Sequence, residues 1–153
     1  MSEDLSTIIY HKDQISVIMM CIIVFAFFQG LAFYFLFSLP EGAWICLSIA
    51  LLVGLFFHKL TVKVSNDYLY LAFGIGIIHR KINLQSIEKV EAVQNRWWYG
   101  YGIRYTPHGW LWNIQGLDAV ELTYTNGKCF RVGTGDVDTL LMVLQKQVMF
   151  NNE

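Results

Sequence analysis

The run ISVIMMCIIVFAFFQGLAFYFLFSL occupies residues 15–39 and contains no Asp, Glu, Lys or Arg. A second charge-free run, GAWICLSIALLVGLFF, occupies residues 42–57, and only Pro40 and Glu41 separate the two. Because an α-helix rises about 1.5 Å per residue, the first run spans about 37 Å and the second about 24 Å, against a hydrocarbon core of about 30 Å. The sequence therefore predicts two membrane-spanning helices that form an antiparallel hairpin.

Two other interpretations of these runs fit the composition less well. A cleaved signal peptide would be shorter, would follow basic residues and would not lead at once into a second apolar run. A buried hairpin in a soluble protein would need far more chain to cover it than 153 residues provide. Charged residues make up only 15% of the chain, whereas soluble domains carry about 25%. We therefore expect an integral membrane protein.

The charges that flank the runs predict the orientation of the hairpin. Lys12 precedes the first run, and Lys59 and Lys63 follow the second, whereas the connection carries only Glu41. By the positive-inside rule, both ends of the hairpin lie in the cytoplasm. The chain then divides into three parts: a cytoplasmic N-terminal segment (residues 1–14), a two-helix transmembrane hairpin (15–59) and a cytoplasmic domain (60–153).

Small residues recur at a spacing of four in both runs. Ala26 and Gly30 form one pair, and Ala50 and Gly54 form the other. Such pairs let helix backbones approach closely in a membrane, so we expect them to lie at the contact between the two helices. The alternative is that small residues are simply common in membrane helices.

The remainder of the chain alternates between short β-like runs and turn signals, up to about residue 132. Asp136 then provides an N-cap, and apolar residues recur after it at helical spacing. About seven short strands followed by one amphipathic helix is the order of a pleckstrin-homology-like (PH-like) barrel, a strongly bent antiparallel sheet with the helix at one open end. The predicted fold is thus a membrane α-helical hairpin plus an α+β domain of this kind.

The pair Asn126-Gly127 is the strongest hairpin signal in the chain. A two-residue turn there would place apolar side chains opposite charged ones. A three-residue loop with Gly127 in the left-handed region instead collects the apolar side chains on one face and sets Glu121 opposite Arg131 on the other. We therefore predict the longer loop, with Glu121 and Arg131 as a cross-strand ion pair of structural role.

The domain also carries a long motif. The runs WYGYGIRYTPHGW (98–110), AVEL (119–122) and GTGD (133–136), with Asn113 and Gly116 between the first two, resemble a family of small bacterial membrane proteins. Members of that family have two transmembrane helices followed by a bacterial PH-like domain. The resemblance implies a multi-pass protein of the bacterial inner (plasma) membrane, and it says more about the fold than about the function.

The segment 96–112 is the most unusual part of the chain, because seven of its seventeen residues are aromatic. In one interpretation it is an interfacial loop whose indoles lie at headgroup level while its basic residues reach lipid phosphates. In the other, the aromatic rings fill the open barrel and Arg104 binds backbone carbonyls. The candidate site residues for lipid or partner binding are Arg96, Trp97, Trp98, Arg104, His108 and Trp110.

His79, Arg80 and Lys81 form a second candidate site. In PH folds, basic residues near the early strands hold phosphate groups. The preceding residues 74–76 are neutral and apolar, so a solvated strand face is the alternative. The isoleucines around this turn would instead form a wedge into the bilayer or contact a partner.

The sequence contains no recognisable catalytic or metal-binding motif. The four histidines are scattered, and the three cysteines lack the spacing of a metal site. A net charge of −1 argues against nucleic acid as a partner. We therefore expect no enzyme, no cofactor, no metal and no small-molecule substrate.

The sequence thus predicts a non-enzymatic, membrane-anchored interaction module. It would present its domain to a protein partner or to another copy of itself at the cytoplasmic membrane surface, in contact with membrane lipids. The first alternative is a sensor of anionic lipid headgroups that uses Arg80, Lys81, Arg96 and Arg104. The second is an accessory subunit of a membrane complex or transporter.

Overall fold

The computed structural model describes residues 8–36, 38 and 40–151. The start of the expected N-terminal segment (residues 1–7), the end of the first apolar run at Leu39 and the last two residues of the domain lie outside the described residues. The described chain is an α+β fold with three α-helices and two β-sheets. In chain order its elements are β1 (Ile8–Ile15), α1 (Val17–Phe35), α2 (Pro40–Phe57), β2 (Lys59–Ser65), β3 (Tyr68–Phe73), β4 (Ile78–Asn83), η1 (Leu84–Ser86), β5 (Ile87–Gln94), η2 (Trp97–Tyr99), β6 (Gly102–Thr106), β7 (Gly109–Asn113), β8 (Asp118–Tyr124), β9 (Cys129–Gly133) and α3 (Val137–Asn151).

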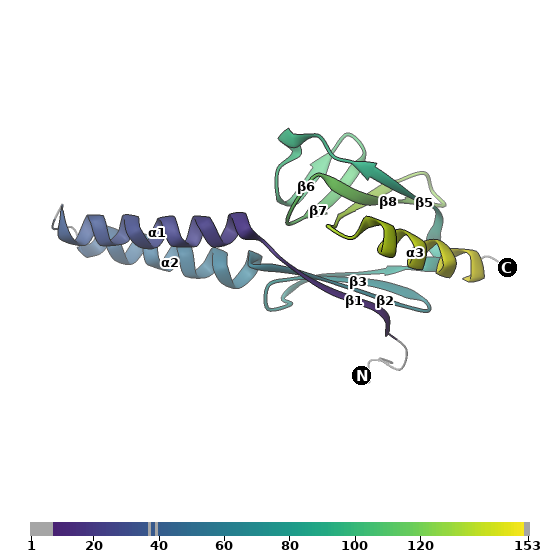
Figure 1. The fold of residues 1–153 in the computed structure, drawn as a ribbon, viewed down its shortest axis with the longest axis horizontal. Helices are drawn as coiled ribbons and strands as arrows, with labels where there is room; N and C mark the ends of the chain where they lie inside the picture. Colours follow the sequence, from purple (N-terminus) through teal and green to yellow (C-terminus); the bar gives the residue numbers. More distant parts are fainter. Residues whose placement is uncertain (1–7, 37, 39, 152–153) are drawn as a thin grey trace.

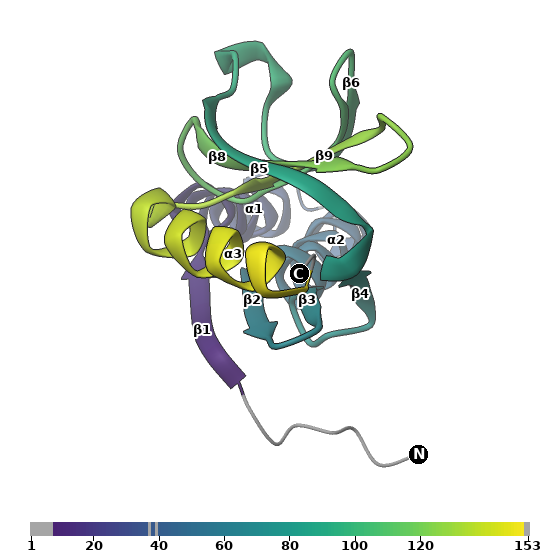
Figure 2. The ribbon, with the colours of Figure 1, turned by 90° about the vertical axis from the view of Figure 1, so that its right-hand side faces the viewer.

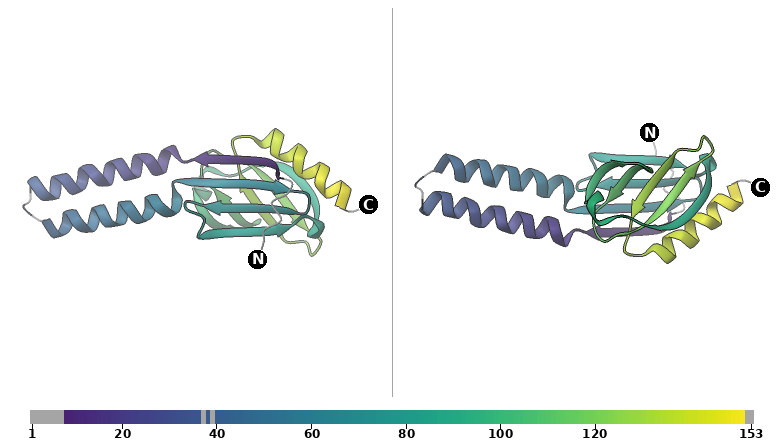
Figure 3. Two further views of the ribbon diagram at one scale, coloured as in Figure 1. Left: turned by 90° about the horizontal axis from the view of Figure 1, so that it is seen from below. Right: turned by 90° about the horizontal axis from the view of Figure 1, so that it is seen from above.

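Helices α1 and α2 lie side by side and project from the rest of the molecule (Figure 1, Figure 3). α1 begins at Val17 because the Ser16 hydroxyl accepts a hydrogen bond from the Met19 amide at 3.1 Å. Within the described part of the chain, α1 is the one helix long and apolar enough to cross a membrane. The apolar helix Glu41–Phe57 is shorter than this criterion requires. Of the two membrane spans expected from the sequence, length and composition therefore support only the first.

Two of the predicted small residues lie where the helices approach each other. Gly30 is buried, and a Cβ added to it would lie 3.5 Å from Cγ of Leu47. A Cβ on Gly54 would lie 3.1 Å from Cδ1 of Ile23, so a larger residue would require that side chain to move. Of the other two small residues, Ala50 is buried and Ala26 is half-buried.

The N-terminal segment contributes a strand that the sequence analysis did not predict. β1 pairs antiparallel with β2 at the edge of the first sheet, whose order is β1-β2-β3-β4. Because β1 leads into α1 and α2 leads into β2, the two strands continue the helical hairpin into the sheet (Figure 3). The Ser16 amide donates a hydrogen bond to the His58 carbonyl at 3.1 Å where helices and strands meet. The start of α1 and the end of α2 therefore lie at the same end of the helical pair, next to the first sheet.

The second sheet has the order β5-β8-β9-β7-β6, with β7 and β9 parallel and the other neighbours antiparallel. The register of β8 and β9 is the one that a three-residue loop requires: Glu121 pairs with Arg131, and Gly127 has a φ of +77°. A Cβ on Gly109 would lie 2.1 Å from the Cys129 carbonyl oxygen, so only glycine lets the start of β7 approach β9 this closely.

The two sheets face each other across one apolar core (Figure 2). This arrangement corrects the expected single barrel of about seven strands, because the described chain forms nine strands in two sheets and no closed barrel. Two features account for the difference. The short helix η1 carries the chain from β4 into the second sheet, and the aromatic segment, to which no strand was assigned from the sequence, supplies β6 and β7.

Helix α3 closes one side of the stacked sheets, between β1 and β5 (Figure 2). Leu140, Leu144 and Val148 are buried on its inner face. The Gln145 side-chain amide donates a hydrogen bond to the Val90 carbonyl at 3.0 Å, which ties the helix to β5. The amphipathic helix expected at the C-terminal end of the domain is therefore present.

Candidate functional site

The loop between β5 and β6 holds two adjacent indoles in solvent. Trp97 is 76% exposed and Trp98 is 56% exposed, and their rings meet edge to face with centroids 5.8 Å apart. The guanidinium of Arg96 lies over the Trp98 ring, 5.0 Å from its centroid. The Asn95 amide anchors the start of the loop by donating a hydrogen bond to the Leu117 carbonyl at 2.7 Å. Large apolar side chains presented from an anchored loop are typical of a contact surface.

The β6–β7 hairpin divides the aromatic segment between surface and core. Tyr105 and Trp110 form an exposed cross-strand pair with ring centroids 5.3 Å apart. Trp112 is only 6% exposed, because its ring packs against Phe73 and Phe130 in the core. The interpretation in which the aromatic rings fill the interior therefore holds for one of the four tryptophans in this segment.

Each arginine of the aromatic segment has a different kind of partner. The Arg104 side chain is exposed and its Nε donates a hydrogen bond to the Tyr101 carbonyl at 3.1 Å, the backbone contact that the structural interpretation anticipates. Arg96 lies over an indole instead. His108 is exposed at the β6–β7 turn, where its amide donates to the Thr106 hydroxyl. These contacts do not assemble a common site for a phosphate.

The three residues of the basic triplet on β4 contact three different aromatic rings. The guanidinium of Arg80 lies over the core ring of Phe130, 4.5 Å from its centroid. The ammonium of Lys81 lies over the Tyr68 ring, 3.9 Å from its centroid, and the His79 ring stacks on another tyrosine of β3. Because successive side chains of a strand point to opposite faces, this triplet cannot converge on one anion.

A polar cluster joins β1 to the start of α3. The ammonium of Lys12 lies 3.0 Å from Oδ2 of Asp136. The buried side chain of Gln14 donates to the Gly133 carbonyl at 3.3 Å and accepts from the Gly135 amide at 3.2 Å. Sequence reasoning missed this cluster. The sequence offers no local signal for it, because residues 10–14 carry a polar group at every position and the partners of Lys12 and Gln14 lie 119 to 124 residues away.

The cluster perturbs several titrating groups. A hydrogen bond from the Thr139 hydroxyl, at 2.7 Å, is the largest cause that lowers the pKa of Asp136. Burial, followed by the negative charge of Asp136, raises the pKa of Tyr10 to about 12. On the other face of β1, the Thr61 hydroxyl donates to the Asp13 carboxylate at 2.5 Å and lowers its pKa. The contacts that cause these pKa shifts are the ones that hold β1 against its neighbours.

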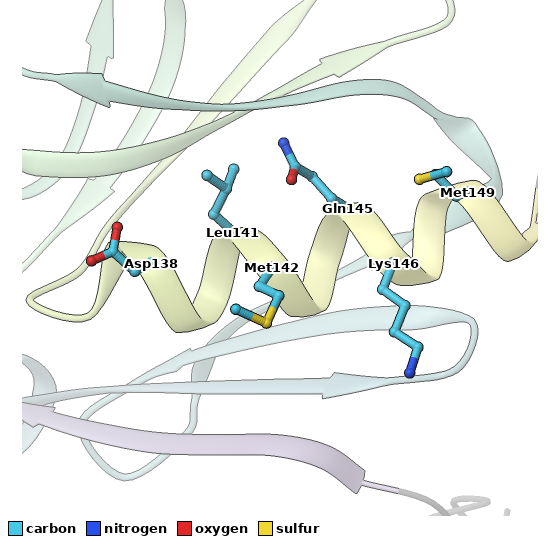
Figure 4. A pocket seen from close by; sticks show the side chains of 6 residues that line it. All are labelled: Asp138, Leu141, Met142, Gln145, Lys146 and Met149. Carbon is cyan, nitrogen blue, oxygen red and sulfur yellow. The ribbon is translucent and has the colours of Figure 1, made fainter.

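A shallow depression follows the outer side of α3 (Figure 4). Leu141 and Gln145 point toward β5, whereas Met142 and Lys146 point away from it. All the lining residues belong to one helix, so the depression is an open face and not an enclosed pocket. Its large exposed apolar side chains are Met142, Met149 and the neighbouring Phe150.

In residues 8–36, 38 and 40–151, no group of three or more His, Cys, Asp or Glu side chains is placed to hold a metal ion. No model of a known protein family and no curated protein matches the sequence.

Proposed function

We propose that this protein is a non-enzymatic, membrane-anchored interaction module of the bacterial inner membrane. In this proposal α1 and α2 span the bilayer as a hairpin, and a PH-like domain faces the cytoplasm. The observation that carries the proposal is the hydrogen-bonded pairing of β1 with β2, the two strands that enter and leave the hairpin. Because these strands are neighbours in one sheet, a first helix that crosses the membrane requires the second to cross back.

The surface of the helices supports a lipid environment. Only 6% of the apolar window of α1 is buried, whereas the core helix of a soluble protein is mostly buried. α2 spans about 27 Å, close to the hydrocarbon thickness of about 30 Å. In water, an apolar surface of this extent would promote aggregation, whereas in hydrocarbon it is favourable. The exposed large apolar side chains of the helices include Phe25, Phe28, Phe35, Trp44, Leu51 and Leu52.

The position of β1 argues against a cleaved leader. Cleavage after α1 would remove the edge strand of the first sheet and leave β2 as an unprotected edge. It would also remove Gln14, whose buried side chain bonds to Gly133 and Gly135 at the β9–α3 junction. A retained hairpin keeps these contacts.

Two further features support the topology and the fold assignment. Lys12, Lys59 and Lys63 flank the open end of the hairpin, whereas its connection carries Glu41, which favours a cytoplasmic domain. A single C-terminal helix across the open side of two packed sheets is in keeping with the PH-like assignment.

A protein partner, or a second copy of the chain, is favoured over an anionic-lipid sensor. The basic residues of the sensor hypothesis do not converge, since Arg80, Lys81 and Arg96 each lie over a different aromatic ring. The outer face of α3 extends toward the end of the domain opposite the helices, where a cytoplasmic partner or a neighbouring membrane subunit has access (Figure 1). Its exposed methionines are adaptable contacts.

The membrane topology can be tested with single cysteines in the full-length protein, after Cys21, Cys46 and Cys129 have been replaced. We expect the protein to resist alkaline carbonate extraction. We also expect Ile9→Cys and Asn126→Cys to react with a membrane-impermeant maleimide from the cytoplasmic face only. Labelling of the two positions from opposite faces, or a monodisperse product without detergent, would contradict the hairpin.

The interaction role can be tested with a photo-cross-linking amino acid at Met149, and at Asn126 as the exposed control. We expect a discrete adduct from Met149 in intact cells and none from Asn126. An adduct of twice the chain mass would identify a second copy, and another mass would identify a partner subunit. The absence of an adduct from Met149 would contradict an interaction through α3.

A further inference from the structure

We propose that the end of the domain nearest the helices rests on the bilayer through two loops, together called the bilayer-facing end. They are the β3–β4 turn (residues 74–77), inserted beside α2, and the η2 loop (residues 96–99), at headgroup level. The ligand of this surface is the lipid bilayer itself, bound by apolar insertion and not by recognition of charge. This inference rests on the proposed membrane hairpin. It names the surface through which the domain contacts the bilayer.

The β3–β4 turn is fixed against the last turn of α2. The Ile75 amide donates a hydrogen bond to the Leu55 carbonyl at 3.3 Å, and the Gly74 amide donates to the Lys59 carbonyl at 2.8 Å. Gly74 has a φ of +54°, and a Cβ on it would lie 2.1 Å from the Leu55 carbonyl oxygen. The turn therefore requires glycine there and lies at the depth of the helix end.

The side chains that this turn presents are apolar and open. Ile75 is 57% exposed and Ile77 is 63% exposed. A water-facing turn is normally built from polar residues, whereas isoleucines beside the end of a membrane helix gain free energy by entering the acyl boundary. The hydrogen bond to Leu55 places them next to the apolar part of α2. Insertion thus explains both the composition and the position of the turn.

The η2 loop lies at the same end of the domain. The connection between β5 and β6 is on the side of the second sheet nearest the helices, whereas α3 extends away from them (Figure 1). The headgroup region adds about 5 to 8 Å on each side of the hydrocarbon core, which is the layer where indoles concentrate. Trp97 and Trp98 are exposed on this loop, and Arg96 lies over the Trp98 ring, an arrangement that suits a wet, polar interface.

Charge recognition is not required by this geometry. Lys81 and Arg80 lie over aromatic rings, and Arg104 bonds to a backbone carbonyl. The contact should therefore form on zwitterionic as well as anionic membranes, which separates it from a sensor of anionic headgroups.

The experiment places an environment-sensitive NBD fluorophore on single cysteines of the otherwise cysteine-free, full-length protein. The test positions are Ile77→Cys and Trp97→Cys. Asn126→Cys is the control, because Asn126 is exposed and lies outside the face of α3 that is proposed to bind a partner. Its turn bonds to η1 through the Thr125 amide and the Ser86 carbonyl, at the end of β4 away from the β3–β4 turn. Val24→Cys, on the exposed surface of α1, reports whether the hairpin is inserted. The protein is reconstituted into phosphatidylcholine vesicles, with or without phosphatidylglycerol, that contain a nitroxide-labelled lipid.

We expect the labels at 77 and 97 to show blue-shifted emission and to lose most of their fluorescence to the nitroxide lipid in both kinds of vesicle. The label at 126 should remain water-like. If the label at 77 or 97 is water-like while the label at 24 is quenched, the proposed contact with the bilayer is contradicted, whereas the membrane hairpin is supported. Quenching at 77 and 97 that requires phosphatidylglycerol also overturns the inference. An unquenched label at 24 overturns the hairpin and this inference with it.

Discussion

The ammonium of Lys12 lies 3.0 Å from the Oδ2 atom of Asp136, and this ion pair joins the strand that enters the helical hairpin to the residue that precedes α3. The Tyr10 hydroxyl donates to the same carboxylate oxygen at 3.4 Å. The helices and the C-terminal part of the domain are thereby connected through β1. The stability of this connection should depend on pH at both ends of the scale.

Acid should weaken the connection through Asp136. The pKa of the Asp136 carboxyl is lowered in the folded protein, first by the hydrogen bond from Thr139 and then by Lys12. The charged carboxylate therefore stabilises the fold above the unfolded pKa of about 3.9, and this contribution is lost as the pH falls through the folded pKa. We expect Asp136→Asn to lower the midpoint of thermal unfolding at neutral pH, with a gap to wild type that closes below about pH 4. Circular dichroism in detergent measures both midpoints. Asp67→Asn, at an exposed turn, is the control, and a gap that persists at low pH would contradict the assignment.

Alkali should act through Tyr10. Burial is the chief cause that raises the pKa of the Tyr10 hydroxyl to about 12. The neutral phenol therefore stabilises the fold fully below the unfolded pKa of about 10, and this contribution is lost as the pH rises toward the folded pKa. We expect wild type to lose stability faster than Tyr10→Phe between about pH 10 and pH 12. Urea midpoints across this range give the comparison, and parallel curves for the two proteins would rule out the role of Tyr10.

The tryptophans of the aromatic segment should differ sharply in their contribution to stability. Trp112→Ala removes a core ring and should cost about 3 to 5 kcal/mol. Trp97→Ala removes an exposed ring and should change the free energy of unfolding in detergent by less than about 0.5 kcal/mol. Denaturant titration of the two variants tests the division of the segment into core and surface. Similar losses for both would indicate that Trp97 is buried.

The pair formed by Glu121 and Arg131 should behave as a buried ion pair. The distance from the Arg131 Nε to the Glu121 carboxylate is 2.5 Å, and both side chains are largely buried. Arg131→Met alone leaves the carboxylate unpaired and should cost about 3 to 5 kcal/mol. The double variant Glu121→Leu/Arg131→Met should recover most of that loss, because apolar residues can replace a buried pair. A double variant as unstable as the sum of the single ones would indicate independent roles.

The close approach of the β3–β4 turn to α2 should depend on Gly74. Gly74→Ala places a Cβ against the Leu55 carbonyl and should lower the thermal midpoint clearly. Gly76→Ala is the matched control, since Gly76 also has a positive φ, +90°, but a Cβ there meets nothing within 4 Å. We expect the control to show only the cost of the left-handed backbone, about 1 kcal/mol. Equal effects of the two substitutions would mean that the contact with α2 does not matter.

Local pattern was sufficient for several elements of this fold. The register of β8 and β9 follows from placing apolar residues on one face, and it agrees with the pairing of Glu121 with Arg131. The helices are read from charge-free runs and from apolar spacing at 3.6 residues. Each of these signals arises between residues that are close in the chain, so a single sequence contains it.

Distant contacts decided the rest. β1 is a strand because it pairs with β2 across the helical hairpin. Its side chains Tyr10, Lys12 and Gln14 find further partners at the β9–α3 junction, more than one hundred residues away, which nothing local indicates. The division of the aromatic residues, with Trp112 in the core and Trp97 outside, depends on which sheet covers them.

The amino-acid sequence alone determined that two apolar stretches form helices, that a hairpin closes at Asn126-Gly127 and that an amphipathic helix ends the domain. Only the tertiary structure decided that the strands form two sheets, that the N-terminal strand joins one of them, and that an isoleucine turn lies against the end of α2. The physical reason is range. Helix and turn preferences act between near neighbours, whereas burial and strand pairing depend on residues that only the folded chain brings together.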